Sequence, residues 1–326
     1  MRVLISGTTG FIGSALAPRL ASLGHDVYCL ERYVTGRYCL GMHHALKTVY
    51  ADLNDHAEVD RHIRTVKPEI IIHLAAISAA SYSYDHPLEV QQTNYEATVH
   101  LAESARKHDP NLKQFIFAGS SEMYGNQKTF PITENARYHP NSPYAVARVA
   151  AFEYLQFMRE AYDFPVSIPI NFNTYGRRNN EHFVVERTIR QMLDNPNGTV
   201  KLGDPEPTRD FLYVDDHVEG YVRALNNPVS IGESFNVATG VGVTIRELAD
   251  RIAKLTGFEG DIVWQTIPSR PSDIKYLIGD SSKLKKLLGW KPSVMLHEGL
   301  VRTIDAMTNE LKQPHTCLAC GQELTT

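Results

Sequence analysis

The sequence has little cysteine, no strong excess of one charge and no long apolar run. Its 326 residues include 4 cysteines, too few for a disulfide scaffold in a chain of this length. The 33 lysines and arginines are balanced by 37 aspartates and glutamates, so nothing indicates a nucleic-acid surface. No apolar run reaches the roughly 18 residues of a membrane span, and the N-terminus lacks the layout of a signal peptide. These absences predict a soluble, cytoplasmic protein without nucleic-acid or membrane partners.

Short apolar runs alternate with amphipathic helical segments through the first half of the chain. Residues 2–6 form an unbroken apolar run, which is typical of a strand buried on both faces of a parallel sheet. Repeated units of this kind predict an α/β fold with a doubly wound, Rossmann-type parallel sheet. Further strands are expected at 26–30, 48–50, 70–74, 114–118 and 166–171, and helices at 11–23, 55–66, 89–108 and 144–162.

The alternation breaks after about residue 173, where glycine, proline and asparagine become frequent. We predict a dinucleotide-binding domain of residues 1–172 plus about 212–253, where a strand at 235–237 and two helices would return to the first domain. Residues 173–211 and 254–312 would form a smaller substrate-binding lobe over the carboxyl ends of the strands. Residues 313–326 would be a flexible tail.

A glycine-rich turn lies between the first strand and the first helix. Gly7 permits the tight turn, Gly10 lets the backbone approach a pyrophosphate, and Gly13 lets the helix pack close to the strand. The helix N-terminus adds N–H groups and the positive end of a dipole. We therefore expect a dinucleotide here, in contact with Gly7, Thr9, Gly10, Phe11, Ile12 and Gly13.

An acidic residue about 20 positions further on should bind the adenosine ribose of that dinucleotide. Glu31 ends the second strand, and its carboxylate suits a free 2′-hydroxyl, which favours NAD. Arg32 or Arg37 could instead pair with a 2′-phosphate, so NADP is an alternative. Asp52 and Leu53 follow the third strand, where the adenine would lie, although Asp52 could equally be the N-cap of the next helix.

Five motifs together resemble the extended short-chain dehydrogenase/reductases, and among these the enzymes that modify nucleotide sugars. They are the glycine turn, His73-Leu74-Ala75-Ala76, Asn94, Ser120-Ser121-Glu122 and Pro143-Tyr144, and the likeness extends to about residue 310. The resemblance implies that Leu74, Ala75 and Ala76 contact the cofactor. It also implies that Asn94 positions the active-site backbone or a water molecule.

The chemistry of this family rests on a tyrosine, a lysine four residues later and a nearby hydroxyl. Tyr144 and Ser120 match the tyrosine and the hydroxyl, and a cation one helical turn away favours the phenolate that removes a sugar hydroxyl proton. The sequence has Arg148 in place of the lysine. Arginine keeps the charge and can reach the nicotinamide ribose, but it aims its donors differently. A dinucleotide-binding sensor without turnover is therefore one alternative.

Glu122 points to the type of reaction. In similar enzymes, dehydratases carry an acid here to remove the C5 proton once C4 is oxidised, whereas epimerases usually lack one. The Ser121-Glu122 pair resembles the pattern of the GDP-mannose 4,6-dehydratases. We predict an NAD(P)-dependent nucleotide-sugar 4,6-dehydratase. The alternatives are a 4-epimerase, a 4-keto reductase, and a Glu122 with only a structural role.

Other residues are assigned to the substrate by the same resemblance. Guanidinium groups suit phosphate oxygens, although Arg209 could instead form an ion pair with Asp210. The substrate set is Ser121, Glu122, Asn173, Arg178, Arg209 and Arg270.

Two further expectations concern assembly and metals. Similar enzymes pair the helices near 89–108 and 144–162 across a two-fold axis, so we expect a homodimer or homotetramer. His315, Cys317 and Cys320 could supply some of the four ligands that zinc requires, but no second cysteine pair completes a site, and we predict no metal. The apolar seam between subunits could comprise Ala97, Leu101, Ala105, Ala151, Tyr154 and Leu155.

Overall fold

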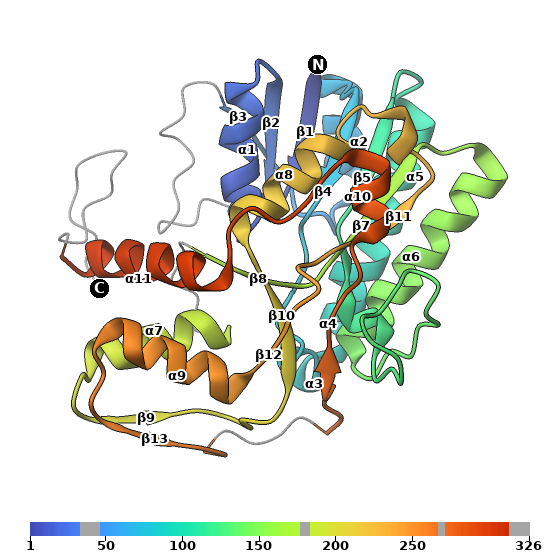
Figure 1. Ribbon diagram of the computed structural model, residues 1–326. Helices are drawn as coiled ribbons and strands as arrows, with labels where there is room; N and C mark the ends of the chain where they lie inside the picture. The colour runs from blue at the N-terminus through green and yellow to red at the C-terminus, as the bar shows by residue number, and fades with distance from the viewer. Residues whose placement is uncertain (33–45, 177–182, 267–270, 313–326) are drawn as a thin grey trace.

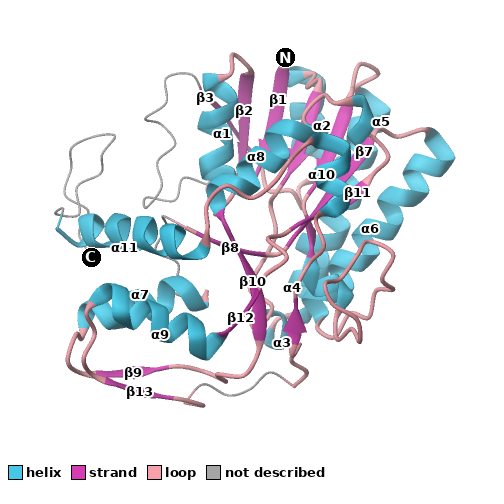
Figure 2. Cartoon of the chain, viewed as in Figure 1, coloured by secondary structure: helices cyan, strands magenta, loops and turns pink. Residues whose placement is uncertain are grey.

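The computed structural model describes residues 1–32, 46–176, 183–266 and 271–312. Its larger part is a parallel sheet with helices on both faces, and a smaller lobe lies beyond one end of the strands (Figures 1 and 2). The strand order is β11-β7-β5-β4-β1-β2-β3, with β6 beside β7, which confirms the predicted doubly wound sheet. The strands are β1 Arg2–Ser6, β2 Asp26–Glu31, β3 Leu46–Tyr50, β4 Ile70–His73, β5 Gln114–Phe117, β6 Gly119–Ser120, β7 Val166–Asn171 and β11 Ser234–Val237.

Alternate residues of these strands feed two cores, one on each face of the sheet. On one face Leu4, Ile71 and Phe115 pack with residues of α2, α5 and α6. On the other face Val3 and Ile72 pack with residues of α1 and α8. This two-sided burial explains why the strands read as unbroken apolar runs. The helices are α1 Gly13–Ser22, α2 His56–Val66, α5 Ala97–His108, α6 Pro143–Tyr162 and α8 Val214–Ala224.

The segment that we expected to form one helix at 89–108 has three parts. A short helix, α4 (Pro87–Gln91), leads into a π-helical turn at Gln92–Glu96, and α5 follows without a break. A π turn inserts one extra residue into the helix and changes the direction of the side chains after it. Asn94 lies inside this turn and is fully buried. A four-residue helix, α3 (Tyr82–Asp85), precedes α4.

The lobe has a core of its own. Strand β10 pairs with β8, β12 and β14, and β9 pairs with β13. Helices α7, α9 and α11 share a buried apolar cluster with β10. The lobe comprises β8 Asn173–Tyr175, α7 Val184–Asp194, β9 Thr199–Lys201, β10 Thr208–Tyr213, β12 Gly242–Thr244, α9 Ile245–Thr256, β13 Asp261–Val263, β14 Tyr276–Leu277 and α11 Leu296–Lys312. Outside it lie α10 Ser282–Leu288 and short helical turns at Ser121–Tyr124 and Pro228–Ser230.

Two helices lie elsewhere than we expected. We predicted that both helices of 212–253 would pack with the first domain, but only α8 contacts α1, whereas Leu248 and Ile252 of α9 pack with α7 in the lobe. The antiparallel pairing of β12 with β10 turns the chain back into the lobe just before α9 begins. Conversely, α10 falls in our predicted lobe but packs against β11 through Leu284. The limits of the two domains remain our interpretation.

Most residues of the predicted subunit seam are buried in the core of the chain itself. Ala97, Leu101, Ala105, Ala151 and Leu155 are at most 1% exposed, and all but Ala97 pack in the core beneath α5 and α6. They are therefore unavailable to a partner. The exposed apolar side chains of α6 are instead Val146, Phe157 and Tyr162.

Within residues 1–32, 46–176, 183–266 and 271–312, no helix has the length and apolar character needed to cross a bilayer. In the same ranges, histidine, cysteine, aspartate and glutamate nowhere form a group of three or more that could hold a metal ion. His315, Cys317 and Cys320 lie outside the described residues.

Candidate active site

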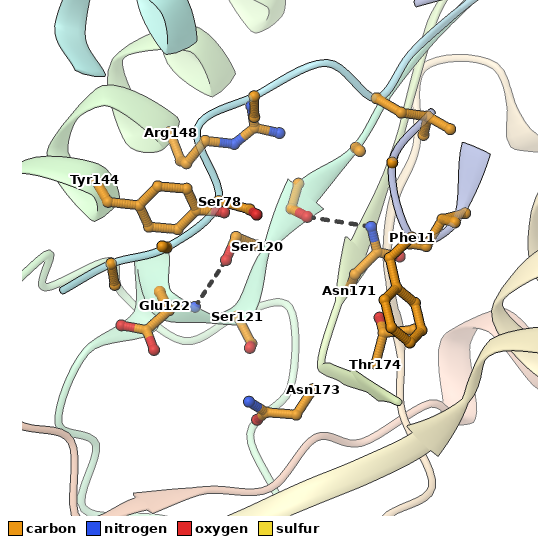
Figure 3. Close-up of a pocket in the computed structure, with 18 of the residues that line it drawn as sticks. Phe11, Ser78, Ser120, Ser121, Glu122, Tyr144, Arg148, Asn171, Asn173 and Thr174 are labelled. Carbon is orange, nitrogen blue, oxygen red and sulfur yellow. Dashed lines mark hydrogen bonds between the residues drawn. The ribbon is translucent and has the colours of Figure 1, made fainter. Parts of the chain in front are cut away.

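A pocket of about 280 Å³ lies at the carboxyl ends of the central strands, where open α/β sheets bind their ligands (Figure 3). It brings together side chains that are far apart in the sequence. Tyr144, Ser120 and Glu122 lie on one side of the pocket and Phe11 on the opposite side. Of the residues predicted for the site, the pocket is lined by Gly7, Gly10, Phe11, Ile12, Gly13, Leu74, Ala76, Ser120, Ser121, Glu122, Tyr144, Arg148 and Asn173.

The glycine turn is shaped so that only glycine fits at two positions. Gly7 has a φ of +76°, and a Cβ there would lie 2.7 Å from the Ala75 nitrogen. A Cβ on Gly13 would collide with the Gly7 carbonyl oxygen. The backbone of the turn, the first turn of α1 and the 74–76 loop are thus held close together. The resulting cradle fits a pyrophosphate beside a helix N-terminus.

Glu31 lies where an adenosine ribose is expected, at the end of β2. Its side chain is 6% exposed, and one of its carboxylate oxygens has no hydrogen-bond partner. Burial raises the pKa of Glu31, while hydrogen bonds from Thr9 of the glycine turn act in the opposite direction. A buried carboxylate with a spare acceptor fits a ribose diol. Arg32 follows at the surface, and Arg37 lies outside the described residues.

Asp52 and Leu53 follow β3 and do not line the pocket among its described residues. The Asp52 carboxylate accepts a hydrogen bond from the Asn54 nitrogen at 2.9 Å, which closes a local turn. The N-cap of α2 is Asp55, whose carboxylate accepts from the Glu58 nitrogen at 3.2 Å. Our alternative interpretation of Asp52 as the N-cap is therefore wrong, because the capping residue lies three positions later in the chain.

Tyr144 is placed by the start of α6. The Ser142 side chain caps the helix by accepting a hydrogen bond from the Ala145 nitrogen at 3.1 Å, and Pro143 occupies the first helical position. Tyr144 follows directly, 7% exposed, and its ring points into the pocket (Figure 3). The capped N-terminus fixes the backbone from which the phenol extends.

Arg148 lies one helical turn after Tyr144 and is 3% exposed. Its guanidinium carbon lies 4.3 Å from the centre of the Phe117 ring. The Nε and Nη1 atoms are buried without a hydrogen-bond partner. Burial lowers the pKa of Arg148, and the neighbouring phenols of Tyr144 and Tyr221 act in the opposite direction. The residue therefore brings a positive charge and two unused donors to the wall of the pocket.

Ser120, Ser121 and Glu122 form the end of β6 and the first turn after it. The Ser120 hydroxyl oxygen accepts a hydrogen bond from the Glu122 nitrogen at 3.3 Å, which caps the helical turn Ser121–Tyr124. This contact uses an acceptor position of Ser120 and leaves its proton to be donated. Glu122 is half-buried on the pocket wall, and its carboxylate lies on the same side as Tyr144 (Figure 3).

Only some of the residues predicted to bind the substrate line the pocket. The Asn173 side-chain oxygen is buried without a partner at the pocket, so it can accept a hydrogen bond from a ligand. Arg209 does not line the pocket and contacts Asp273 at 3.3 Å. Its sequence neighbour Asp210 instead accepts hydrogen bonds from Thr239, Gly240 and Gly279, so the Arg209–Asp210 ion pair that we considered is wrong. Arg178 and Arg270 lie outside the described residues.

Several pocket residues were missed from the sequence. Ser78 and Ser81 follow the loop after β4, Asn171 ends β7, and Phe183 packs edge-on against Phe11 at 6.3 Å. The signal for Ser78 was its position in the loop after a buried strand, and that for Asn171 was its position as the last residue of one, since ligand-binding residues gather at the carboxyl ends of strands. Phe183 had no such signal because it enters the site from the lobe.

Comparisons with known proteins agree with this geometry. Residues 4–303 match the model of the GDP-mannose 4,6 dehydratase family. The chain is 35% identical to a UDP-glucose 4-epimerase of Mycolicibacterium smegmatis, over 95% of this chain and 99% of the relative. A UDP-glucose 4-epimerase structure from Thermotoga maritima, solved with UDP-glucose, superposes with a TM-score of 0.88 at 30% identity, covering 95% of this chain and 100% of that one. A dTDP-glucose 4,6-dehydratase structure from Streptomyces venezuelae, with NAD bound, gives 0.86 at 25% identity, covering 96% and 98%.

Proposed function

Because the chain belongs to the GDP-mannose 4,6-dehydratase family, we propose that it is an NAD-dependent nucleotide-sugar 4,6-dehydratase. The observation that carries this proposal is the position of Glu122. Its carboxylate shares a pocket wall with the Tyr144 phenol and the Ser120 hydroxyl. A dehydratase needs such a carboxylate beside the group that acts at C4, because the C5 proton is acidic only when C4 is a ketone.

The cofactor assignment rests on residues of the glycine turn and on Glu31. The cradle formed by Gly7 and Gly13 fits the pyrophosphate, and the spare oxygen of the buried Glu31 carboxylate fits a free ribose diol, which supports NAD rather than NADP. The unused donors of Arg148 would face the nicotinamide ribose. NAD, when bound, supplies the two-electron acceptor for the C4 carbon of the sugar and later returns the electrons at C6.

The residues divide the proton transfers among themselves. Tyr144 takes the proton of the C4 hydroxyl, and Ser120 donates a hydrogen bond to the same oxygen. Glu122 then takes the C5 proton, which the new ketone has made acidic. Glu122 passes this proton to the C6 hydroxyl, which leaves as water as the C5–C6 double bond forms, and a proton from solvent later reaches C5. At the pocket wall, Asn173 would bind the substrate diphosphate through its side-chain amide nitrogen, because phosphate oxygens accept hydrogen bonds.

A nucleotide-sugar 4-epimerase is the second candidate. The 35% identity to a UDP-glucose 4-epimerase over nearly the full length of both chains favours it. Epimerisation at C4 would also use Tyr144, Ser120 and Arg148. It would have no task for Glu122 at C5, however, so the two candidates make different predictions about that proton.

The test is turnover of a panel of sugar nucleotides in deuterated water, followed by mass spectrometry and NMR of the products. A dehydratase product lacks one water and carries deuterium at C5, since the proton that is added to C5 after the loss of water comes from solvent. An epimerase product keeps the mass of its substrate and gains no deuterium. Epimerised product without C5 exchange would overturn the proposal, as would the absence of any turnover across the panel in the presence of NAD.

A further inference from the structure

His73 is a buried titratable residue that the proposed reaction does not use. It ends β4 and is 1% exposed. Its Nδ1 lies 2.7 Å from the Ser6 hydroxyl oxygen, at the end of β1 and directly before the glycine turn. Its Nε2 lies 2.9 Å from the Thr98 hydroxyl oxygen in α5. The ring therefore connects the end of β1 to α5, next to the loops that form the cofactor cradle.

The hydrogen bonds of Thr98 decide where the proton of His73 is. The Thr98 hydroxyl donates its single proton to the Asn94 carbonyl oxygen at 3.0 Å. It must therefore accept from His73, which places the imidazole proton on Nε2. Burial, and to a smaller extent the charge of Arg148, lowers the pKa of His73 to about 3, so the ring is neutral. Nδ1 is then an acceptor, and the Ser6 hydroxyl donates to it.

The chain of hydrogen bonds reaches both loops of the cradle. The Ser6 oxygen accepts from the Ala75 nitrogen at 3.4 Å, and Ala75 is the residue against which Gly7 packs. At the other end, the π turn buries the Asn94 side chain, which bonds to both backbone groups of Ile77, at 2.8 and 3.0 Å. Residues 74–77 are thus fastened at one end through Ser6 and at the other through Asn94.

We propose that His73 is a positioning residue of the cofactor site: its neutral imidazole, protonated on Nε2, joins Ser6 to Thr98 and so holds the glycine turn and the 74–77 loop in one fixed arrangement. The proposal rests on the dinucleotide site of the proposed function, but not on which sugar reaction follows. Leu74 and Ala76 line the pocket. A loop that must be ordered on each binding event binds its ligand more weakly than one that is already ordered.

Thr98 offers a sharp test because it does not line the pocket among the described residues. Thr98→Val keeps the shape but removes the acceptor for His73 Nε2–H, and Thr98→Ser keeps the hydroxyl as the matched control. We expect Thr98→Val to weaken NAD binding, measured by calorimetry, by roughly tenfold, the cost of one unmade buried hydrogen bond. Thr98→Ser should bind NAD like the wild type, and Ser6→Ala should behave like Thr98→Val.

A second measurement determines the tautomer and the protonation state of the His73 imidazole directly. In nitrogen-15 NMR of histidine-labelled wild-type protein, His73 should show the Nε2-protonated tautomer and no titration between about pH 5 and pH 8. An Nδ1-protonated or titrating ring would overturn the proposal even if the variants failed to fold. The Thr98→Val protein could also fold, bind NAD as tightly as the wild type and differ only in a lower melting temperature. His73 would then have a structural role alone, and the proposal would be overturned. A failed dehydratase assignment appears in the product instead, and leaves these readouts intact.

Discussion

The guanidinium of Arg148 lies over the ring of Phe117, 4.3 Å from its centre. The two residues come from α6 and from the end of β5, and both are buried. The groups that act on the charge of Arg148 in the described part of the chain include the phenols of Tyr144 and Tyr221 but no carboxylate, so the face of Phe117 contributes to stabilising the guanidinium. A planar, delocalised cation suits such a face better than a compact ammonium group.

We expect Arg148→Lys to impair the protein, although lysine is the residue that the resemblance in the sequence implies at this position. A lysine buried here without a carboxylate would tend to lose its proton, because desolvation disfavours the charged form. The cation that favours the Tyr144 phenolate would then be lost. We expect kcat to fall by at least about tenfold, one pKa unit of activation, with the loss greatest at high pH. The pH–rate profile measures this. Wild-type kcat across the profile would show that the site accepts either cation.

Glu122→Gln keeps the shape of the side chain but cannot take a proton. We expect dehydrated product to fall by about 10²–10⁴-fold, the usual contribution of a general base. Exchange of C5 deuterium should be lost in parallel. Glu153→Gln, on the exposed face of α6, is the matched control and should turn over normally. Near wild-type formation of a 4-keto-6-deoxy sugar by Glu122→Gln would show that Glu122 is only structural.

Glu186 in α7 should make stability depend on pH. Its side chain is fully buried, one oxygen accepts from the Gly176 nitrogen at 3.1 Å, and the other has no partner. Burial raises the pKa of Glu186 from 4.5 to about 8. The unfolded chain therefore loses this proton at lower pH than the folded one, so stability falls as pH rises from 4.5 towards 8.

Glu186→Gln should remove that dependence. We expect the variant to gain on the order of a few kcal/mol in the free energy of unfolding near pH 8, and little below pH 4.5. Urea unfolding of both proteins at several pH values measures the difference. A constant difference across the range would mean that the carboxyl does not titrate in this window.

The homodimer remains a prediction, now on a different surface. Phe157 and Tyr162 are each 48% exposed on α6, and Tyr162 is covered in part by the Arg106 guanidinium of α5. Burying such rings between subunits would stabilise a dimer. Phe157→Glu should then shift light-scattering mass towards the monomer. The control, Val229→Glu, alters an equally exposed side chain in the Pro228–Ser230 turn. A wild type that is monomeric at micromolar concentration would contradict the prediction.

The sequence was most informative where local chemistry determines structure. The glycine turn, the strand ends and the Pro143-Tyr144 helix start each carry their own physical reason, so Gly7, Ser120 and Tyr144 could be expected in one pocket. The parallel sheet followed from unbroken apolar strands, because burial on both faces leaves no polar alternation.

Relationships between distant segments could not be predicted in this way. Nothing near Arg148 in the sequence points to Phe117, and nothing near Glu186 points to its burial behind Gly176. The placement of α9 depends on β12 pairing with β10, a contact between segments that are about thirty residues apart. Such contacts are decided by the whole fold rather than by local pattern.

The chain crosses between the large sheet and the lobe several times, and this has a consequence for folding. It leaves the sheet at β7, returns through α8 and β11, leaves again through β12 and α9, returns at α10 and ends in the lobe with α11 (Figure 1). At one return, the Asp216 carboxylate in α8 accepts hydrogen bonds from Ser293 and Val294, which lead into α11. Neither part is a continuous piece of chain that could be expressed alone. Heating should therefore unfold both together in a single cooperative transition.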